Sequence, residues 1–173
     1  RTDLDAVTFA PLGGTQPMTW AQSLAANYTD GILVMHRGRV VYERYFGALG
    51  PEGMHIAHSV TKSFAGTIAA MLVAEGKLDP DAPVSRYLPE LEHSGFGDAT
   101  VRQGLDMTTG IKYSEKYADP DADVWRFARS ASLVPRPAGY TGPATAYEFL
   151  ATVAKEGEHG QAFVYKSPNT EVL

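Results

Sequence analysis

The stretch that decides the fold reads Ala57-His-Ser-Val-Thr-Lys-Ser-Phe-Ala-Gly-Thr-Ile-Ala-Ala-Met-Leu-Val-Ala-Glu75. Its large apolar residues recur every three or four positions, at Phe64, Ile68, Met71 and Leu72. This is the spacing of an amphipathic helix, and Gly76 follows it as a stop signal. The pattern predicts one long helix with these apolar residues along one side.

Ser59 and Lys62 open this helix. Residues three apart lie on one helix face, so the amine of Lys62 can reach the hydroxyl of Ser59. A serine hydroxyl attacks a carbonyl when a neighbouring base takes its proton, and a lysine can be that base if burial or nearby cations lower its pKa. The N–H groups of a helix start also favour developing negative charge. The pattern indicates a nucleophile beside its base; the alternative is an N-cap serine followed by a solvated lysine.

The composition is that of one globular domain. The 173 residues are 44% hydrophobic and 20% charged, which is enough to form a sizeable core. The net charge of −5 is spread along the chain without a basic run, which excludes nucleic acid and anionic membrane surfaces as partners. Because the sequence has no cysteine, disulfides, thiol nucleophiles and thiolate metal sites are excluded.

The sequence leaves the cellular compartment open. It begins at Arg1 and contains neither a signal-like apolar segment nor an apolar stretch of membrane-spanning length. These features favour the cytoplasm slightly, and the start at Arg1 predicts trimming or processing.

The rest of the chain is expected to be organised around the long helix. Residues 1–30 are interpreted as a packed lead-in that ends in a short helix from Trp20 to Tyr28. Residues 31–47 form two β-rich runs around Arg37-Gly38, which is typical of a hairpin. Residues 57–173 are expected to hold the nucleophile helix and a helical region, with short helices at 100–107, 124–130 and 145–156 and an extended segment at 163–165.

No metal or cofactor site is expected. His55 and His58 lack a third ligand, and the run from Asp119 to Asp123 lacks the glycine and the bidentate glutamate of an EF-hand loop. His58 is not expected to be the base for its neighbour Ser59, because adjacent side chains point in different directions. No Gly-x-Ser-x-Gly turn occurs, which argues against an α/β-hydrolase.

The segment from His58 to Phe64, after a hairpin and at the start of a long helix, resembles the nucleophile segment of the serine β-lactamase and penicillin-binding superfamily. Residues 76–91 and 105–111 are similar to connecting segments of its class C branch, which includes esterases and amide hydrolases. The resemblance implies an α+β fold of the β-lactamase/transpeptidase type, in which an antiparallel sheet packs with a helical region.

The same resemblance implies roles for three further residues. Tyr165 falls where the branch carries the tyrosine of a Tyr-x-Asn motif, which would make it a catalytic group beside Ser59 and Lys62. Ser167 takes the place of the asparagine and would bind substrate, although a hydroxyl has one proton to donate and a shorter reach than an amide. This departure puts β-lactam recognition in doubt. Residues 113–120 resemble the amide hydrolases of the branch, which would place Tyr117 against the leaving amide nitrogen.

The chemistry expected from these residues is hydrolysis through an acyl-enzyme. Ser59 would attack an amide or ester carbonyl of a small linear substrate while Lys62 and Tyr165 share the proton, with no metal or organic cofactor. One alternative is a penicillin-binding, DD-carboxypeptidase-like or β-lactamase-type enzyme. A second alternative is a non-catalytic relative that uses the pocket only for recognition.

The chain is expected to be the N-terminal portion of a single catalytic unit. The resemblance implies further C-terminal sheet strands after a helix that begins near Asn169, one of them with a Lys/His-Thr/Ser-Gly-like motif, and no such strand or motif occurs before Leu173. The N–H of Ser59 would supply one oxyanion donor and the absent strands the other. A complementary C-terminal fragment of the same protein is therefore the expected partner.

Overall fold

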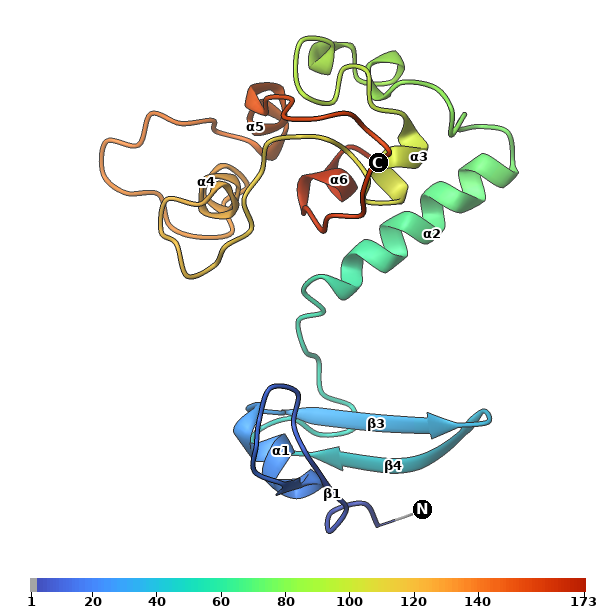
Figure 1. Cartoon of the computed structure of the whole chain (residues 1–173), viewed down its shortest axis with the longest axis vertical. Helices are drawn as coiled ribbons and strands as arrows, with labels where there is room; N and C mark the ends of the chain where they lie inside the picture. The colour runs from blue at the N-terminus through green and yellow to red at the C-terminus, as the bar shows by residue number, and fades with distance from the viewer. Residues whose placement is uncertain (1–2) are drawn as a thin grey trace. The chain divides into compact units, whose positions relative to one another are not determined.

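The computed structural model of the chain describes residues 3–173. These residues fall into two compact units, one that extends to Ala57 and one that runs from His58 to Leu173. Figure 1 shows the strands of the first unit and the helices of the second.

The lead-in of the first unit contains a small strand pair and a capped helix. Strand β1 (Thr8–Phe9) pairs antiparallel with β2 (Met18–Thr19), a pairing that the sequence does not predict. Helix α1 (Trp20–Ala26) follows directly and confirms the predicted helix, ending two residues earlier. A capping box fixes its start, because Thr19 Oγ1 accepts from the N–H of Gln22 and Gln22 Oε1 accepts from the N–H of Thr19.

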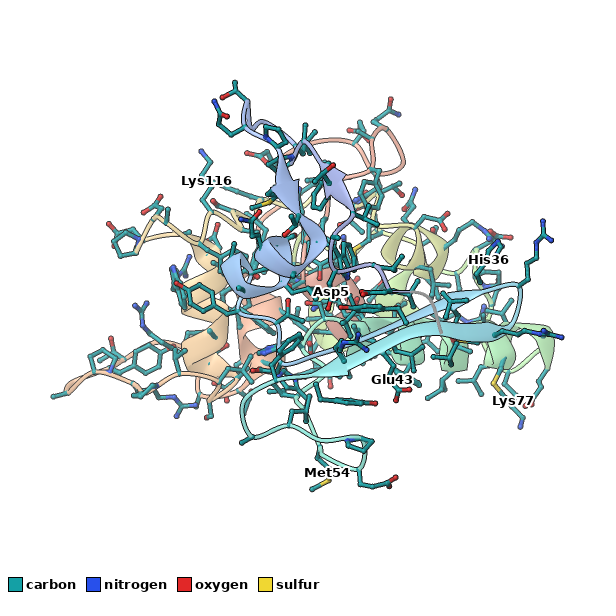
Figure 2. The ribbon with its side chains drawn as sticks, turned by 90° about the horizontal axis from the view of Figure 1, so that it is seen from below. Asp5, His36, Glu43, Met54, Lys77 and Lys116 are labelled. Atoms are coloured by element: carbon teal, nitrogen blue, oxygen red, sulfur yellow. The ribbon has the colours of Figure 1, made fainter. Side chains whose placement is uncertain are left out.

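The predicted hairpin is confirmed. Strand β3 (Gly31–His36) pairs antiparallel with β4 (Arg39–Tyr45), and a bulge lies between Val34 and Met35. The two turn residues have φ angles of 51° at Arg37 and 75° at Gly38, and two positive φ values are what a type I′ turn requires. Figure 2 shows His36 at the turn end of β3.

A small aromatic cluster holds the lead-in against this hairpin. The side chain of Tyr42 is buried, and the ring of Trp20 meets it edge to face at 6.1 Å between centroids. The Tyr42 hydroxyl donates to Asp5 Oδ1 at 2.5 Å, and Arg44 lies 3.8 Å from the same carboxylate. Burial, and next the bond to Asp5, raise the pKa of Tyr42. The lead-in is therefore packed, as the sequence predicts.

The second unit begins with the long helix. Helix α2 (Val60–Ala74) confirms the prediction, and Gly76 ends it with a φ of 69°. The elements that follow are η1 (Val84–Arg86), η2 (Pro89–Leu91), α3 (Val101–Leu105), α4 (Asp123–Ser130), α5 (Ala146–Thr152) and α6 (Pro168–Glu171). Figure 1 shows α3 beside α6, and residue contacts join this pair.

The core of the second unit lies among these short elements. Its aromatic centre is Phe149, whose ring contacts Phe127 at 5.6 Å and Tyr113 at 6.2 Å between centroids. The remaining core residues are mostly aliphatic: Val84, Leu91, Phe96, Ala99, Ile111, Ala122, Val124, Leu150, Val153 and Val172. Burying one such large side chain contributes about 2 kcal/mol, so this cluster is the main source of stability.

The apolar side of α2 is not part of that core. Phe64, Ile68 and Met71 are between 57% and 66% exposed, and Ala69 is the buried residue of the helix. The helical spacing is present, but within residues 58–173 these three side chains are not covered by another element.

Two C-terminal predictions need smaller corrections. The helix expected up to Glu156 ends at Thr152, because Val153 is extended and Lys155 forms a bridge with Ile111. Residues 163–165 are not part of any strand in the described chain; instead the N–H of Val164 donates to the Met107 carbonyl at 2.9 Å. Among residues 3–173, no helix has the length and apolar character needed to cross a membrane.

Candidate active site

Ser59 lies at the start of α2 and uses its hydroxyl toward Lys62. It is the N-cap residue by position, but its backbone is already helical, and no capping hydrogen bond from its side chain occurs within residues 3–173. Instead Ser59 Oγ accepts a hydrogen bond from Lys62 Nζ at 3.1 Å. The Ser59 side chain therefore does not cap the helix, and the Lys62 amine lies against it.

The residue before the serine has a strained backbone. His58 has a φ of 45°, in the left-handed region that costs a non-glycine residue about 1 kcal/mol or more. Its carbonyl accepts from the N–H of Thr61 at 3.1 Å, which closes the first turn of α2. The strain is thus tied to the direction in which the chain enters the helix at Ser59.

Tyr165 lies next to the Ser59 and Lys62 pair. The Nζ of Lys62 is 5.7 Å from the centroid of the Tyr165 ring, which is within the range of a cation–π contact. The structure thus brings together the three predicted catalytic residues, which are 3 and 103 positions apart in the chain. Lys62 contacts the ring here, and proton exchange with the Tyr165 hydroxyl requires a closer approach of that oxygen.

The residues that follow Tyr165 are firmly held. Lys166 and Ser167 are both 7% exposed. Lys166 Nζ donates to the Ile111 carbonyl at 2.5 Å, and burial lowers the pKa of this lysine. Because the two residues that follow it are buried, the chain is anchored directly after Tyr165. The sequence did not identify Lys166, since its partner lies 55 residues away.

The two predicted substrate-binding residues meet on one carboxylate. Glu115 Oε1 accepts from the Ser167 hydroxyl at 2.6 Å and from the Tyr117 hydroxyl at 3.0 Å. Glu115 Oε2 accepts from the N–H of Ser167 at 3.0 Å. Sequence reasoning missed Glu115, and the one available signal was an acidic residue two positions before Tyr117.

Tyr117 is fixed from its other side by Trp125. The two rings meet edge to face at 5.9 Å, and Trp125 Nε1 donates to the Tyr117 carbonyl at 3.3 Å. The pKa of Tyr117 is raised, first by burial and then by the hydrogen bond to Glu115. The adjacent Lys116 side chain points outward, as Figure 2 shows. Tyr117 therefore keeps its proton at neutral pH and donates a hydrogen bond to Glu115.

Buried polar contacts join the segment at 107–111 to the segment at 159–169. The Thr109 hydroxyl donates to Asn169 Oδ1, and both residues are buried. The N–H of Gly110 donates to His159 Nδ1 at 2.8 Å, which leaves the ring proton on Nε2 to donate to Asp98. These bonds join the segment just before Glu115 to the segment that contains Ser167.

The candidate metal ligands are not brought together. Within the described range, no three histidine or acidic side chains are grouped so as to hold a metal ion. His55 pairs instead with Asp30 at 2.9 Å and lies against the Ile56 carbonyl, and these contacts raise the pKa of His55.

Residues 21–173 match the sequence profile of the Beta-lactamase family. The chain is 41% identical over 152 residues to 6-aminohexanoate-dimer hydrolase from Paenarthrobacter ureafaciens, a match that covers 88% of the chain and 38% of that protein. It is 40% identical over 53 residues to a beta-lactamase from Providencia stuartii, covering 31% of the chain and 14% of that protein.

Among solved structures, the fold is similar to that of a putative 6-aminohexanoate-dimer hydrolase from Bacillus anthracis. The TM-score is 0.85 at 28% sequence identity, and the superposition covers 99% of the chain and 45% of that protein. The chain thus spans less than half the length of these relatives.

Proposed function

The chain belongs to the Beta-lactamase family, and from this membership we propose that it is part of a serine hydrolase that cleaves an amide or ester of a small linear substrate. Its β-lactamase-like α+β fold, with antiparallel strands and helices, is confirmed by the solved relative. The observation that carries the proposal is the 3.1 Å contact between Ser59 Oγ and Lys62 Nζ at the start of α2, with Tyr165 beside the lysine.

The proposed reaction begins with attack of Ser59 Oγ on the substrate carbonyl. The hydroxyl proton passes to the Lys62 and Tyr165 pair, with Lys62 entering the step as the neutral amine. The Ser59 N–H at the start of α2 would stabilise the resulting oxyanion. The pair then returns the proton to the leaving nitrogen or oxygen as the bond from that atom to the carbonyl carbon breaks and the C=O bond re-forms. Water hydrolyses the acyl-Ser59 ester by the same proton path and regenerates the serine.

We infer a short linear amide as the preferred substrate. The relative at 41% identity is named for the dimer of 6-aminohexanoate, which is such an amide. In this chain, Tyr117 and Ser167 share the Glu115 carboxylate and would lie on the leaving-group side of the bond. A β-lactam substrate is the second candidate, favoured by the match to the beta-lactamase from Providencia stuartii and weakened by Ser167 in place of an asparagine.

We also propose that C-terminal residues of the same protein complete the site. Two observations support this: the relatives are more than twice as long, and within residues 58–173 the apolar side of α2 is exposed. An exposed apolar face of this kind marks an interaction surface. An esterase assay on the purified 173-residue chain, with and without the added C-terminal segment, tests this partner. Ordinary turnover by the chain alone would contradict it.

The function is tested by covalent labelling and a substrate panel. A fluorophosphonate should label Ser59 in the wild-type protein and leave Ser59→Ala unlabelled. The panel comprises p-nitrophenyl esters, an aminohexanoate dimer and nitrocefin, and we expect turnover of the first two. Labelling by penicillin with nitrocefin turnover would favour the β-lactam alternative. A folded protein that takes neither label would be a binding relative.

A further inference from the structure

We propose that Glu115 makes the site selective for amides. It accepts a hydrogen bond from the hydroxyl of Tyr117 and another from that of Ser167, so the two hydroxyl oxygens are left as acceptors for a substrate N–H. This inference rests on the proposed function and assigns Glu115 as a positioning residue.

The donor and acceptor roles follow from the chemistry of the three groups. An ionised carboxylate can only accept hydrogen bonds, whereas a hydroxyl has a single proton to donate. The Ser167 hydroxyl lies 2.6 Å from Glu115 Oε1, the short distance of a charge-assisted bond. The Tyr117 hydroxyl lies 3.0 Å from the same oxygen. Both protons are therefore directed to Glu115.

The carboxylate itself is fixed by the backbone. Its second oxygen accepts from the N–H of Ser167 at 3.0 Å, so it is anchored to the residue whose hydroxyl it orients. Ser167 is 7% exposed and has little freedom to turn its proton elsewhere. Tyr117 is more exposed, but Trp125 contacts its ring and its carbonyl. The arrangement is set before a substrate arrives.

The consequence is a site that offers lone pairs and no hydroxyl proton. The nitrogen of a secondary amide carries an N–H that can donate to such an oxygen. The linking oxygen of an ester carries only lone pairs, so it gains no hydrogen bond there and faces other lone pairs. The site therefore favours the substrate that can donate this hydrogen bond over the one that cannot.

The direct test is Glu115→Gln, which keeps the side-chain volume. The glutamine amide can donate to a hydroxyl oxygen, which frees that hydroxyl to turn its proton toward the substrate. We expect the ratio of kcat/KM for an aminohexanoate dimer to that for a matched p-nitrophenyl ester to fall about tenfold or more, while ester turnover changes little. Glu92→Gln, at an exposed glutamate after η2, is the matched control and should leave the ratio unchanged.

A second readout does not depend on activity. Titration of Tyr117, followed by the NMR signal of its labelled Cζ, should show a lower pKa in Glu115→Gln than in the wild-type chain, because Glu115 raises it. If Glu115→Gln fails to fold, Tyr117→Phe and Ser167→Ala replace it, since each removes one acceptor and should lower the ratio.

The outcomes separate this inference from the function on which it rests. Intact Ser59 labelling and ester turnover with an unchanged amide-to-ester ratio in Glu115→Gln would overturn the inference and leave the hydrolase proposal standing. An unchanged Tyr117 pKa in that variant would also overturn it. Absence of Ser59 labelling and of all turnover in the complete wild-type protein would overturn the function itself.

Discussion

Lys62 lies over the ring of Tyr165, with its Nζ 5.7 Å from the ring centroid. The same Nζ donates to Ser59 Oγ, so one lysine links the nucleophile to the tyrosine. In the proposed reaction these groups form a single unit for moving the proton.

This shared lysine predicts non-additive kinetics. Lys62→Ala and Tyr165→Phe should each lower kcat/KM by about two orders of magnitude or more, because each disables general acid and base catalysis. In the double variant, kcat/KM should fall by much less than the product of the two single factors. After the first change the remaining residue can no longer transfer the proton alone, so removing it has little further effect. The measurement is kcat/KM for ester hydrolysis by the single and double variants. A loss in the double variant equal to the product of the two single losses would contradict the coupling of Lys62 and Tyr165.

Ser59→Ala should abolish turnover with little change in stability. The Ser59 side chain makes no capping bond among the described residues, so the free energy of unfolding should change by less than about 0.5 kcal/mol. Thr100→Ala is the contrasting variant, because Thr100 Oγ1 accepts from the N–H of Gln103 at 3.2 Å and caps α3. Removing this cap should lower the free energy of unfolding by about 1 kcal/mol. Urea unfolding of both variants checks the contrast, and a larger loss in Ser59→Ala would show a hidden capping role.

Tyr117→Phe should affect amides more than esters. The variant removes the hydroxyl proposed to accept the N–H of the leaving nitrogen and keeps the ring contact with Trp125. We expect kcat/KM to fall about tenfold or more for an aminohexanoate dimer and by a smaller factor for a p-nitrophenyl ester. Equal losses on both substrates would mean that Tyr117 has a structural or general binding role.

Tyr113→Phe should not destabilise the protein. The Tyr113 hydroxyl is buried and has no hydrogen-bond partner among residues 3–173, and this burial raises the pKa of Tyr113 far above its usual range. Removing an unpaired buried hydroxyl should leave the free energy of unfolding unchanged or raise it by about 1 kcal/mol. Phe149→Ala, in the same ring cluster, should lower it by about 3 kcal/mol or more. A marked loss in Tyr113→Phe would reveal a partner such as a bound water.

Asp98 should make the free energy of unfolding depend on pH in the acidic range. The salt bridge from Lys155, and then the contact with His159, lower the pKa of Asp98 below its usual 3.8. A depressed pKa gives stability that is fully present above about pH 4 and is lost as the pH falls through the folded value. Because Asp98 is largely exposed, the effect should be under about 1 kcal/mol. Thermal unfolding of wild type and Asp98→Asn should differ at pH 6 and converge near pH 2; a constant difference would contradict the linkage.

The features that could be predicted from the sequence are local ones. The Arg37-Gly38 turn is specified by two adjacent residues, and the end of α2 by Gly76. The contact of Ser59 with Lys62 spans a single helical turn. Each of these depends on interactions among residues close in the chain, which patterns of residue type describe well.

The features that were missed depend on distant partners. Glu115 gains its role through Ser167, 52 residues away, and His159 gains its role through Asp98, 61 residues away. The pairing of β1 with β2 rests on two residues in each strand, too few to produce an alternating pattern. The apolar side of α2 was predicted correctly as a pattern but not as a buried surface, because burial depends on which other residues are available to cover it.

The bonds between the segments at 107–115 and 159–169 also determine when the site can form during folding. Closing a loop of about fifty residues is slow compared with forming a helical turn, and contacts of high sequence separation delay folding. The nucleophile and its lysine can therefore meet as soon as α2 forms. The contact between Glu115 and Ser167 forms only with the last non-local contacts. A refolding protein should therefore recover reactivity at Ser59 before it recovers the preference for amides over esters.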